Sequence, residues 1–288
     1  MTLKITKLSY ALGAEVTGVD ISQPLDDPMF NLINNAFLEH CVLVFRGTPL
    51  TRDQHLAFSR RFGPLDRNEA QSHENPADHP EVAQVISRPK PNGEPATARI
   101  TGEAWHTDHS YLPIAAHASL LRCLEIPTVG GDTMFCNLYR AYESLSDGMK
   151  NLLDGLYGVH VQASARFDTS SPERAAESRR RFPTAAHPVA KVHQETGRKV
   201  LYMNEQVRLF VGMTAAESRP LIEHLTQHAV RPQNVYRHHW RKHDLVMWDN
   251  RCTLHMALAD YDRTQVRHME RTTVKATLSG YAYDGPME

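Results

Sequence analysis

The residue types that could do chemistry gather first in one tetrapeptide, Trp105-His-Thr-Asp108. Side chains at positions i and i+2 of an extended segment point to the same side, with Cα atoms about 6.6 Å apart. His106 and Asp108 could therefore bind one metal ion, and His255 is the best candidate for a third ligand from elsewhere in the chain. Two histidines and one carboxylate leave the opposite face of the ion open, as in Fe(II) enzymes that bind a chelating co-substrate and oxygen. We therefore predict an iron site made by these three residues.

Two arginines follow His255 at a spacing that suits anion binding. Arg267 and Arg271 are four residues apart, so on a strand they face the same side, about 13 Å apart at Cα. Met269 lies between them on that side and would separate them. A guanidinium offers two parallel donors to a carboxylate and keeps its charge at any working pH. The spacing indicates two distinct anion sites, although a surface ion pair is the ordinary alternative for either arginine.

The triad alone leaves other classes of protein open, because a chain with 17 histidines can contain a His-x-Asp motif by chance. A zinc-dependent hydrolase could use the same three ligands. It would need a general base beside the open position, and it gives no role to Arg267. A catalytically silent jelly-roll binding protein is a second alternative, and the intact triad argues against it.

Composition excludes several partners. The chain has 288 residues and a formal net charge of -1, from 32 basic and 33 acidic residues. A protein that binds nucleic acid non-specifically usually carries a basic excess. None of the four cysteines forms a Cys-x-x-Cys pair, which fits a reducing cytoplasm. We see no signal peptide and no apolar run long enough to span a membrane. We expect a cytoplasmic protein that acts on a small molecule.

Hydrophobic patterning predicts a mainly β fold with flanking helices. Helices are expected at residues 27–39, 51–62 and 214–229, with helical turns across 139–156. Strands are expected at residues 13–19, 41–45, 82–86, 117–125, 133–136, 190–193, 200–203, 235–240, 244–248, 253–257 and 267–278. We interpret residues 1–288 as one domain. Polar segments at about 66–104 and 164–184 are expected to be insertions, the first a lid because it runs straight into the His106 motif.

Four motifs, in order along the chain, carry a family resemblance. They are residues 105–111 (WHTDHSY), 130–133 (GGDT), 248–255 (WDNRCTLH) and 267–271 (RHMER). Residues 41–47 and 61–65 add weaker matches nearer the N-terminus. The chain resembles the TauD/TfdA family, the taurine- and phenoxyacetate-type 2-oxoglutarate dioxygenases, over nearly its whole length.

The resemblance implies a double-stranded β-helix, or jelly roll, and an enzyme that uses Fe(II), 2-oxoglutarate and O2. By position, His106, Asp108 and His255 match the family's iron ligands. Thr133 and Arg267 match the residues that bind the distal carboxylate of 2-oxoglutarate. Arg271 matches an arginine that contacts the acid group of anionic substrates. Family members often form dimers or tetramers, so a homo-oligomer is expected.

The substrate is less well defined by the resemblance. Gly102, the run 66–68 and Val207 stand where taurine-cleaving members carry asparagine, histidines and an aromatic residue, which argues against taurine. The carboxylate of Asp108, absent from related halogenases, favours hydroxylation. We expect a small organic anion, with an aryloxy or alkyl carboxylate ahead of a sulfonate or sulfate ester, and cleavage where the hydroxylated carbon bears oxygen. Further pocket candidates are His73, His109, Tyr111, Arg166 and Trp248.

Overall fold

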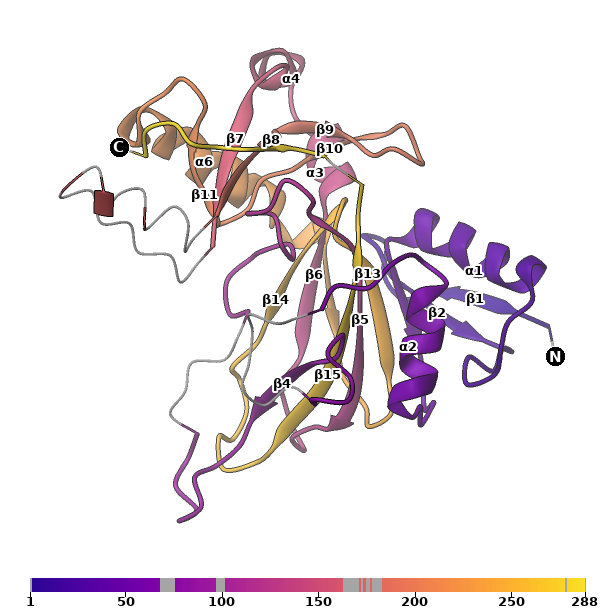
Figure 1. The fold of residues 1–288 in the computed structure, drawn as a ribbon. Helices are drawn as coiled ribbons and strands as arrows, with labels where there is room; N and C mark the ends of the chain where they lie inside the picture. Colours follow the sequence, from indigo (N-terminus) through magenta and orange to yellow (C-terminus); the bar gives the residue numbers. More distant parts are fainter. Residues whose placement is uncertain are drawn as a thin grey trace.

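A computed structural model describes residues 2–67, 76–96, 102–162, 171, 173–174, 177, 183–277 and 279–287. Much of the two expected insertions falls in the gaps, and His73 and Arg166 lie outside the described residues. The described part is mainly β, with helices packed on the outside of the sheets (Figure 1). The chain ends lie on opposite sides of the molecule in that view.

The largest sheet has seven strands and forms one wall of the molecule. Its order is β1 (Lys4–Lys7), β2 (Ala14–Thr17), β3 (Val42–Phe45), β13 (Leu245–Asp249), β5 (Ala116–Glu125), β15 (Arg267–Lys275) and β4 (Ala83–Ser87). Neighbouring strands are antiparallel except for β2 and β3, which are parallel. The long strands β5, β13 and β15 therefore lie side by side at the centre.

Shorter strands build the remaining sheets. One three-stranded sheet has the order β12 (Val235–His238), β6 (Thr133–Asn137) and β14 (Thr253–Ala257). A four-stranded sheet has the order β11 (Val207–Phe210), β7 (Tyr157–Val161), β8 (Thr184–Pro188) and β16 (Tyr281–Ala282). A hairpin pairs β9 (Ala190–Val192) with β10 (Lys199–Leu201).

Capping residues define the helices. The carboxylate of Asp26 accepts from Met29 N at the start of α1 (Asp27–His40). Thr51 and Thr214 form capping boxes at the starts of α2 (Arg52–Arg60) and α6 (Ala215–Ala229), as their sequence patterns predict. The other helices of the described residues are α3 (Leu138–Glu143), α4 (Asp147–Leu153) and the 3-10 turn η1 (Pro232–Asn234). Within the described ranges, none is long and apolar enough to cross a bilayer.

Strand β13 of the seven-stranded sheet is buried on both faces. Val246 and Trp248 of β13 belong to the core that also contains Phe135 and Met269. Leu245 and Met247, which alternate with them, pack in a second core with α1 and α2 (Figure 1). A strand buried on both sides reads as a continuous apolar run, which explains the pattern at residues 244–248. This doubly packed strand is a rigid support for side chains that project from it.

Candidate metal centre and anion sites

A backbone bridge brings the three predicted ligands together. His106 N donates to His255 O at 3.1 Å, and His255 N donates to His106 O at 2.8 Å. This antiparallel pairing joins the segment at residue 106 to β14 and puts the two imidazole centroids 4.1 Å apart. Asp108 lies where a turn begins, and the next residue, His109, has a φ of 57°. The segment is therefore extended only up to Thr107, but Asp108 still faces both histidines.

The ligand atoms are spaced to surround one ion. Asp108 Oδ1 lies 3.9 Å from His106 Nε2, and Asp108 Oδ2 lies 3.9 Å from His255 Nε2. One atom from each of the three residues lies within 4.8 Å of the others. Metal–ligand bonds measure about 2.1 Å, so small side-chain shifts suffice. His106 Nδ1 lies 2.8 Å from Ala104 O, and because a carbonyl only accepts, Nε2 is left for a metal.

The environment of Asp108 keeps its carboxylate ionised. Burial by itself raises the pKa of Asp108, but the positive charge of Arg271 and the nearby His255 and His106 outweigh it, so the pKa lies well below its usual range. Arg271 Nη1 donates to Asp108 Oδ1 at 2.8 Å. Burial, with His106 close by, lowers the pKa of His255 well below its usual value, which favours the neutral form that binds metals.

Two residues that sequence reasoning missed hold Asp108 in place. Ser119 Oγ donates to Asp108 Oδ2 at 2.6 Å. Asn250 Nδ2 donates to Ser119 Oγ at 2.9 Å, and Asn250 Oδ1 accepts from Asp108 N at 3.2 Å and from Trp248 Nε1 at 3.0 Å. Trp248 therefore contributes a hydrogen bond as well as a ring that packs 4.7 Å from His255. Asn250 lies inside the motif at residues 248–255, and this position was the one feature of the sequence that could have pointed to its role.

A second buried cluster of potential ligand atoms consists of His193, Asp249 and Cys252. Arg251 Nε and Nη2 donate to the two oxygens of Asp249 at 2.8 and 2.6 Å. His193 Nε2 lies 3.0 Å from Asp249 Oδ2. Burial raises the pKa of the Cys252 thiol well above its usual value, so the thiolate that a metal needs is disfavoured. This cluster instead fixes the turn that carries Asn250.

Arg267 is a buried cation that no carboxylate of the described residues pairs with. Its side chain is 3% exposed, and Nε donates to Gly131 O at 3.0 Å. Burial lowers the pKa of Arg267 because it disfavours the charged form. Thr133, two residues beyond Gly131, accepts from Trp240 Nε1 at 3.0 Å, so its own hydroxyl proton can be donated elsewhere. A bound carboxylate could accept hydrogen bonds from both the Arg267 guanidinium and the Thr133 hydroxyl.

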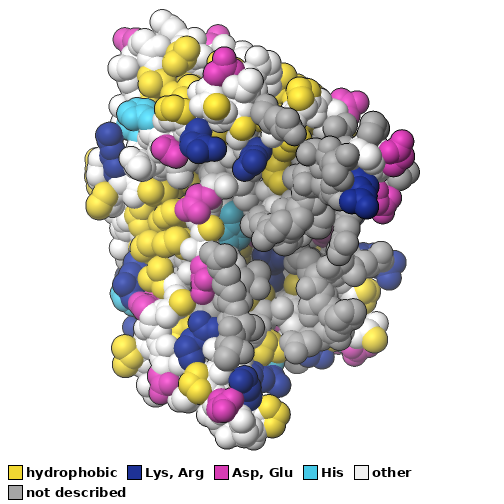
Figure 2. Space-filling model, turned by 90° about the vertical axis from the view of Figure 1, so that its left-hand side faces the viewer, with side chains coloured by type: hydrophobic (Ala, Val, Ile, Leu, Met, Phe, Trp, Pro, Cys, Tyr) yellow, Lys and Arg dark blue, Asp and Glu magenta, His cyan; other side chains and the backbone are white. Residues whose placement is uncertain are grey.

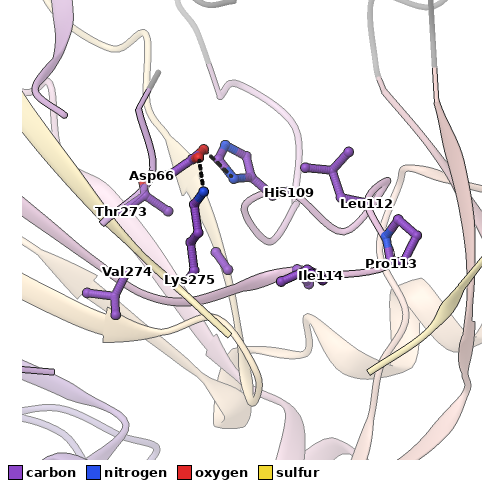
Figure 3. A pocket seen from close by; sticks show the side chains of 10 residues that line it. Asp66, His109, Leu112, Pro113, Ile114, Thr273, Val274 and Lys275 are labelled. Carbon is purple, nitrogen blue, oxygen red and sulfur yellow. Dashed lines mark ion pairs between the residues drawn. The ribbon is translucent and has the colours of Figure 1, made fainter. Parts of the chain in front are cut away.

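A cavity of about 360 Å³ is lined by His109, the residue that follows the candidate ligand Asp108 (Figure 3). Its polar side chains are Asp66, His109, Thr273 and Lys275, and Asp66 forms ion pairs with His109 and Lys275. Its apolar lining is Leu112, Pro113, Ile114, Ala115, Ala116 and Val274. Tyr111 packs against His109 with ring centroids 6.0 Å apart. His109, predicted as a pocket residue, therefore does line a cavity.

The local geometry explains why glycine occupies position 102, where taurine-cleaving members of the family carry asparagine. Gly102 has a φ of 88°, and a Cβ there would lie 3.1 Å from His106 Cε1. An asparagine at this position would be strained by its backbone and would crowd the candidate ligand.

Comparison with known proteins identifies the family. The family model for the taurine catabolism dioxygenase TauD, TfdA family, matches residues 4–273. The chain belongs to this family. As a TauD/TfdA protein it is an Fe(II)- and 2-oxoglutarate-dependent dioxygenase that uses O2, which confirms the predicted enzyme class, cofactors and mainly β fold.

Individual relatives cover most of the chain. It is 33% identical over 282 residues to an alpha-ketoglutarate-dependent 2,4-dichlorophenoxyacetate dioxygenase of Cupriavidus pinatubonensis, covering 95% of this chain and 98% of that one. It is 30% identical to an alpha-ketoglutarate-dependent sulfate ester dioxygenase of Pseudomonas putida, covering 95% and 90%. Among solved structures, AAD-2 in complex with Mn(II) and N-oxalylglycine superposes with a TM-score of 0.84 at 28% identity, covering 98% and 99%.

Proposed function

We propose that this TauD/TfdA dioxygenase hydroxylates a small organic anion, with an aryloxy or alkyl carboxylate as the first candidate. In this proposal His106, Asp108 and His255 bind Fe(II), Thr133 and Arg267 bind the distal carboxylate of 2-oxoglutarate, and Arg271 contacts the acid group of the substrate. The observation that carries it is the triad together with Arg267, a buried cation that lacks an anionic partner among the described residues.

When bound, Fe(II) and 2-oxoglutarate supply the activation of O2 that hydroxylates carbon. The protein supplies position and charge. Ala104 O holds the His106 ring, and Ser119 orients the Asp108 carboxylate. Arg271 carries five N–H donors, so it can hold Asp108 and also donate to an acid. Hydroxylation at a carbon that bears an ether or ester oxygen would give an unstable product that cleaves.

The cavity beside His109 is the proposed compartment for the body of the substrate (Figure 3). Its volume of about 360 Å³ suits one small aryl or alkyl group. The cavity lies close to the candidate metal centre along the chain, because His109 follows Asp108 and Thr273 lies two residues beyond Arg271 on β15. An acid held by Arg271 could therefore extend its apolar part into this space.

A sulfate ester or sulfonate is the second candidate substrate. Its support is the similarity to the Pseudomonas putida sulfate ester dioxygenase. The acid group would again meet Arg271, because a guanidinium donates equally well to sulfate and carboxylate oxygens.

We also propose that the seven-stranded and three-stranded sheets are the two halves of a single-domain jelly roll. In support, β13 and β14 lie in different sheets and are joined directly by the turn at residues 250–252. The same turn carries Asn250, so the joint between the sheets would lie at the metal centre. A homo-oligomer and a cytoplasmic location stay predictions, open to light scattering and fractionation.

Succinate formation tests the reaction. The purified protein would be supplied with Fe(II), ascorbate and 2-oxoglutarate across a panel of aryloxy carboxylates, alkyl carboxylates, sulfonates and sulfate esters. We expect succinate to rise with one class and to be absent with His255→Ala. In Arg267→Met, the KM for 2-oxoglutarate should rise about tenfold or more, since a charge-assisted hydrogen bond to the co-substrate is lost. No succinate above the His255→Ala level under any condition would refute the proposal.

A further inference from the structure

Lys191 is a second buried cation that the catalytic proposal does not use. It lies on β9 and is 7% exposed. Its Nζ donates to Ser279 Oγ at 3.2 Å and lies 3.9 Å from the centroid of the Tyr202 ring. In the ranges that the structure describes, no acidic side chain forms an ion pair with it. The charge attracts Asp249, but both oxygens of that carboxylate are already held by Arg251.

Lys191 keeps most of its charge at neutral pH. Burial lowers the pKa of Lys191 to about 8, because removal of water penalises the ammonium form. At pH 7 the ammonium therefore still predominates. An ammonium has three N–H donors. The hydroxyl of Ser279 and the face of Tyr202 account for two of them.

A cavity of about 560 Å³ is lined in part by Lys191. Its described lining contains no aspartate or glutamate. Arg251 also lines it, but this guanidinium is already paired with Asp249 and Glu195, so Lys191 is the cation available to an anion. Hydroxyl and amide groups come from Gln194, Thr277 and Ser279. One wall is apolar and is formed by Tyr157 and Tyr281, whose ring centroids lie 5.6 Å apart. A cavity with cations, neutral donors and no acids favours an anion.

We propose that this cavity is a second anion site, which binds a small organic oxyanion, a carboxylate or sulfate with an aryl or alkyl body. The oxyanion head contacts Lys191 Nζ and the Ser279 hydroxyl, and the body packs on Tyr157 and Tyr281. The cavity lining includes none of the triad residues, and neither Thr133, Arg267 nor Arg271. It meets the cavity beside His109 only at Ala115 and Ala116. Binding here therefore does not require the metal.

Selenate titration of the metal-free protein tests the oxyanion head, with calorimetry as the readout. Lys191→Met removes the ammonium but keeps an apolar chain of similar length. We expect the selenate Kd to rise about tenfold or more, since a charge-assisted hydrogen bond is lost. Lys199→Met, an exposed lysine on the adjacent strand that pairs with Asp154, is the matched control and should bind as wild type. Arg267→Met should also retain this binding.

Diffraction from selenate-soaked wild-type crystals removes any dependence on how the variants fold. We expect an anomalous selenium peak within hydrogen-bond distance of Lys191 Nζ. Selenate that binds only at Arg267 or Arg271, or binding that Lys191→Met leaves unchanged, would overturn the proposal. Benzoate should displace selenate from this site at lower concentration than acetate does, because of the tyrosine wall. Equal potency of the two acids would overturn the assignment to an organic anion.

Discussion

At the scale of single residues, the orientation of the Asp108 carboxylate is the feature on which the metal centre depends. Its two oxygens have separate donors, since Arg271 donates to Oδ1 and Ser119 to Oδ2. The same two oxygens lie 3.9 Å from His106 and His255. A short hydroxyl–carboxylate hydrogen bond is a strong one. Ser119 therefore determines which way the carboxylate faces the histidines.

Ser119→Ala is predicted to weaken metal binding without unfolding the protein. It removes the donor to Asp108 and leaves Asn250 Nδ2 without its acceptor. Loss of such outer contacts typically costs about 10- to 100-fold in metal affinity. Anaerobic Mn(II) titration would measure it. The control is Ser59→Ala, a buried serine on α2 that bonds to His55 and Thr272. Equal metal affinity in the two variants would show that Ser119 has no positioning role.

Residue types, spacing and the family motifs were enough to single out the three candidate ligands, which the structure brings together. Ser119 and Asn250 have no side-chain chemistry that distinguishes them from other polar residues of the chain. They lie 131 residues apart, and a serine or asparagine near a strand is common. Trp240, which donates to Thr133, reads in sequence as a core aromatic. Their roles come from tertiary contacts that only the fold creates.

At the scale of elements, β15 presents different chemistry on its two faces. Arg267 and Arg271 are on the face that carries the site, whereas Glu270 points to α2. Glu270 accepts from Arg52 at 2.8 Å and from Gln84 at 2.9 Å, and it also pairs with Arg122. This buried ion cluster joins α2 to the central strands. Period-two alternation along one strand thus separates the structural charge of Glu270 from the two arginines proposed to bind anions.

Acid stability is predicted to depend on Glu270. Burial alone would raise its pKa, but hydrogen bonds from Arg52 and Arg122 outweigh this and lower the pKa from 4.5 to about 2. The folded-state pKa is the lower one, so the stabilisation is complete above pH 4.5 and is lost as the pH falls toward 2. Between pH 7 and pH 3 the loss from this group is about 2 kcal/mol.

Urea unfolding at several pH values would measure this contribution. Glu270→Gln should be less stable than wild type at pH 7, because two arginines lose their anionic partner. Its stability should then fall by about 2 kcal/mol less between pH 7 and pH 3. Glu143→Gln, which breaks an exposed pair with Arg198, should follow the wild-type pH profile. A profile for Glu270→Gln as steep as that of wild type would contradict the assignment.

Capped helices and strands with a continuous apolar run were predictable from sequence, and several strands without such a run were not. The capped helices α1, α2 and α6 and the apolar strands β3, β5 and β13 lie within a few residues of their predicted positions. The strands β1, β7, β8, β11 and β16 were missed. β1 reads KITK and is polar on both faces, while Gly158 and His160 interrupt the apolar pattern of β7. These strands form because neighbouring strands pair with them.

At the scale of the whole molecule, distant parts of the chain meet at the candidate metal centre. The candidate ligands come from positions 106, 108 and 255, and Arg267 projects from β15. On the face shown in Figure 2, basic and acidic side chains are interspersed, in keeping with a net charge of -1. Long-range attraction of a polyanion is therefore weak, and we expect anions to be recognised at single buried cations such as Arg267.

Because only the folded chain brings these ligands together, metal binding should raise the thermal stability of the whole protein. A ligand that binds only the native state at 100 times its Kd stabilises it by about 2.7 kcal/mol. For a chain of this size we expect the Tm to rise by about 5 °C or more with saturating Mn(II), and to fall again with excess chelator. Thermal unfolding followed by circular dichroism would measure the shift. His255→Ala should show almost none of this rise in Tm.

At the same Mn(II) concentration, 2-oxoglutarate should raise the Tm of the wild-type protein further. Arg267→Met should lack this second rise. An equal Mn(II) shift in wild type and His255→Ala would place the metal at some other set of residues.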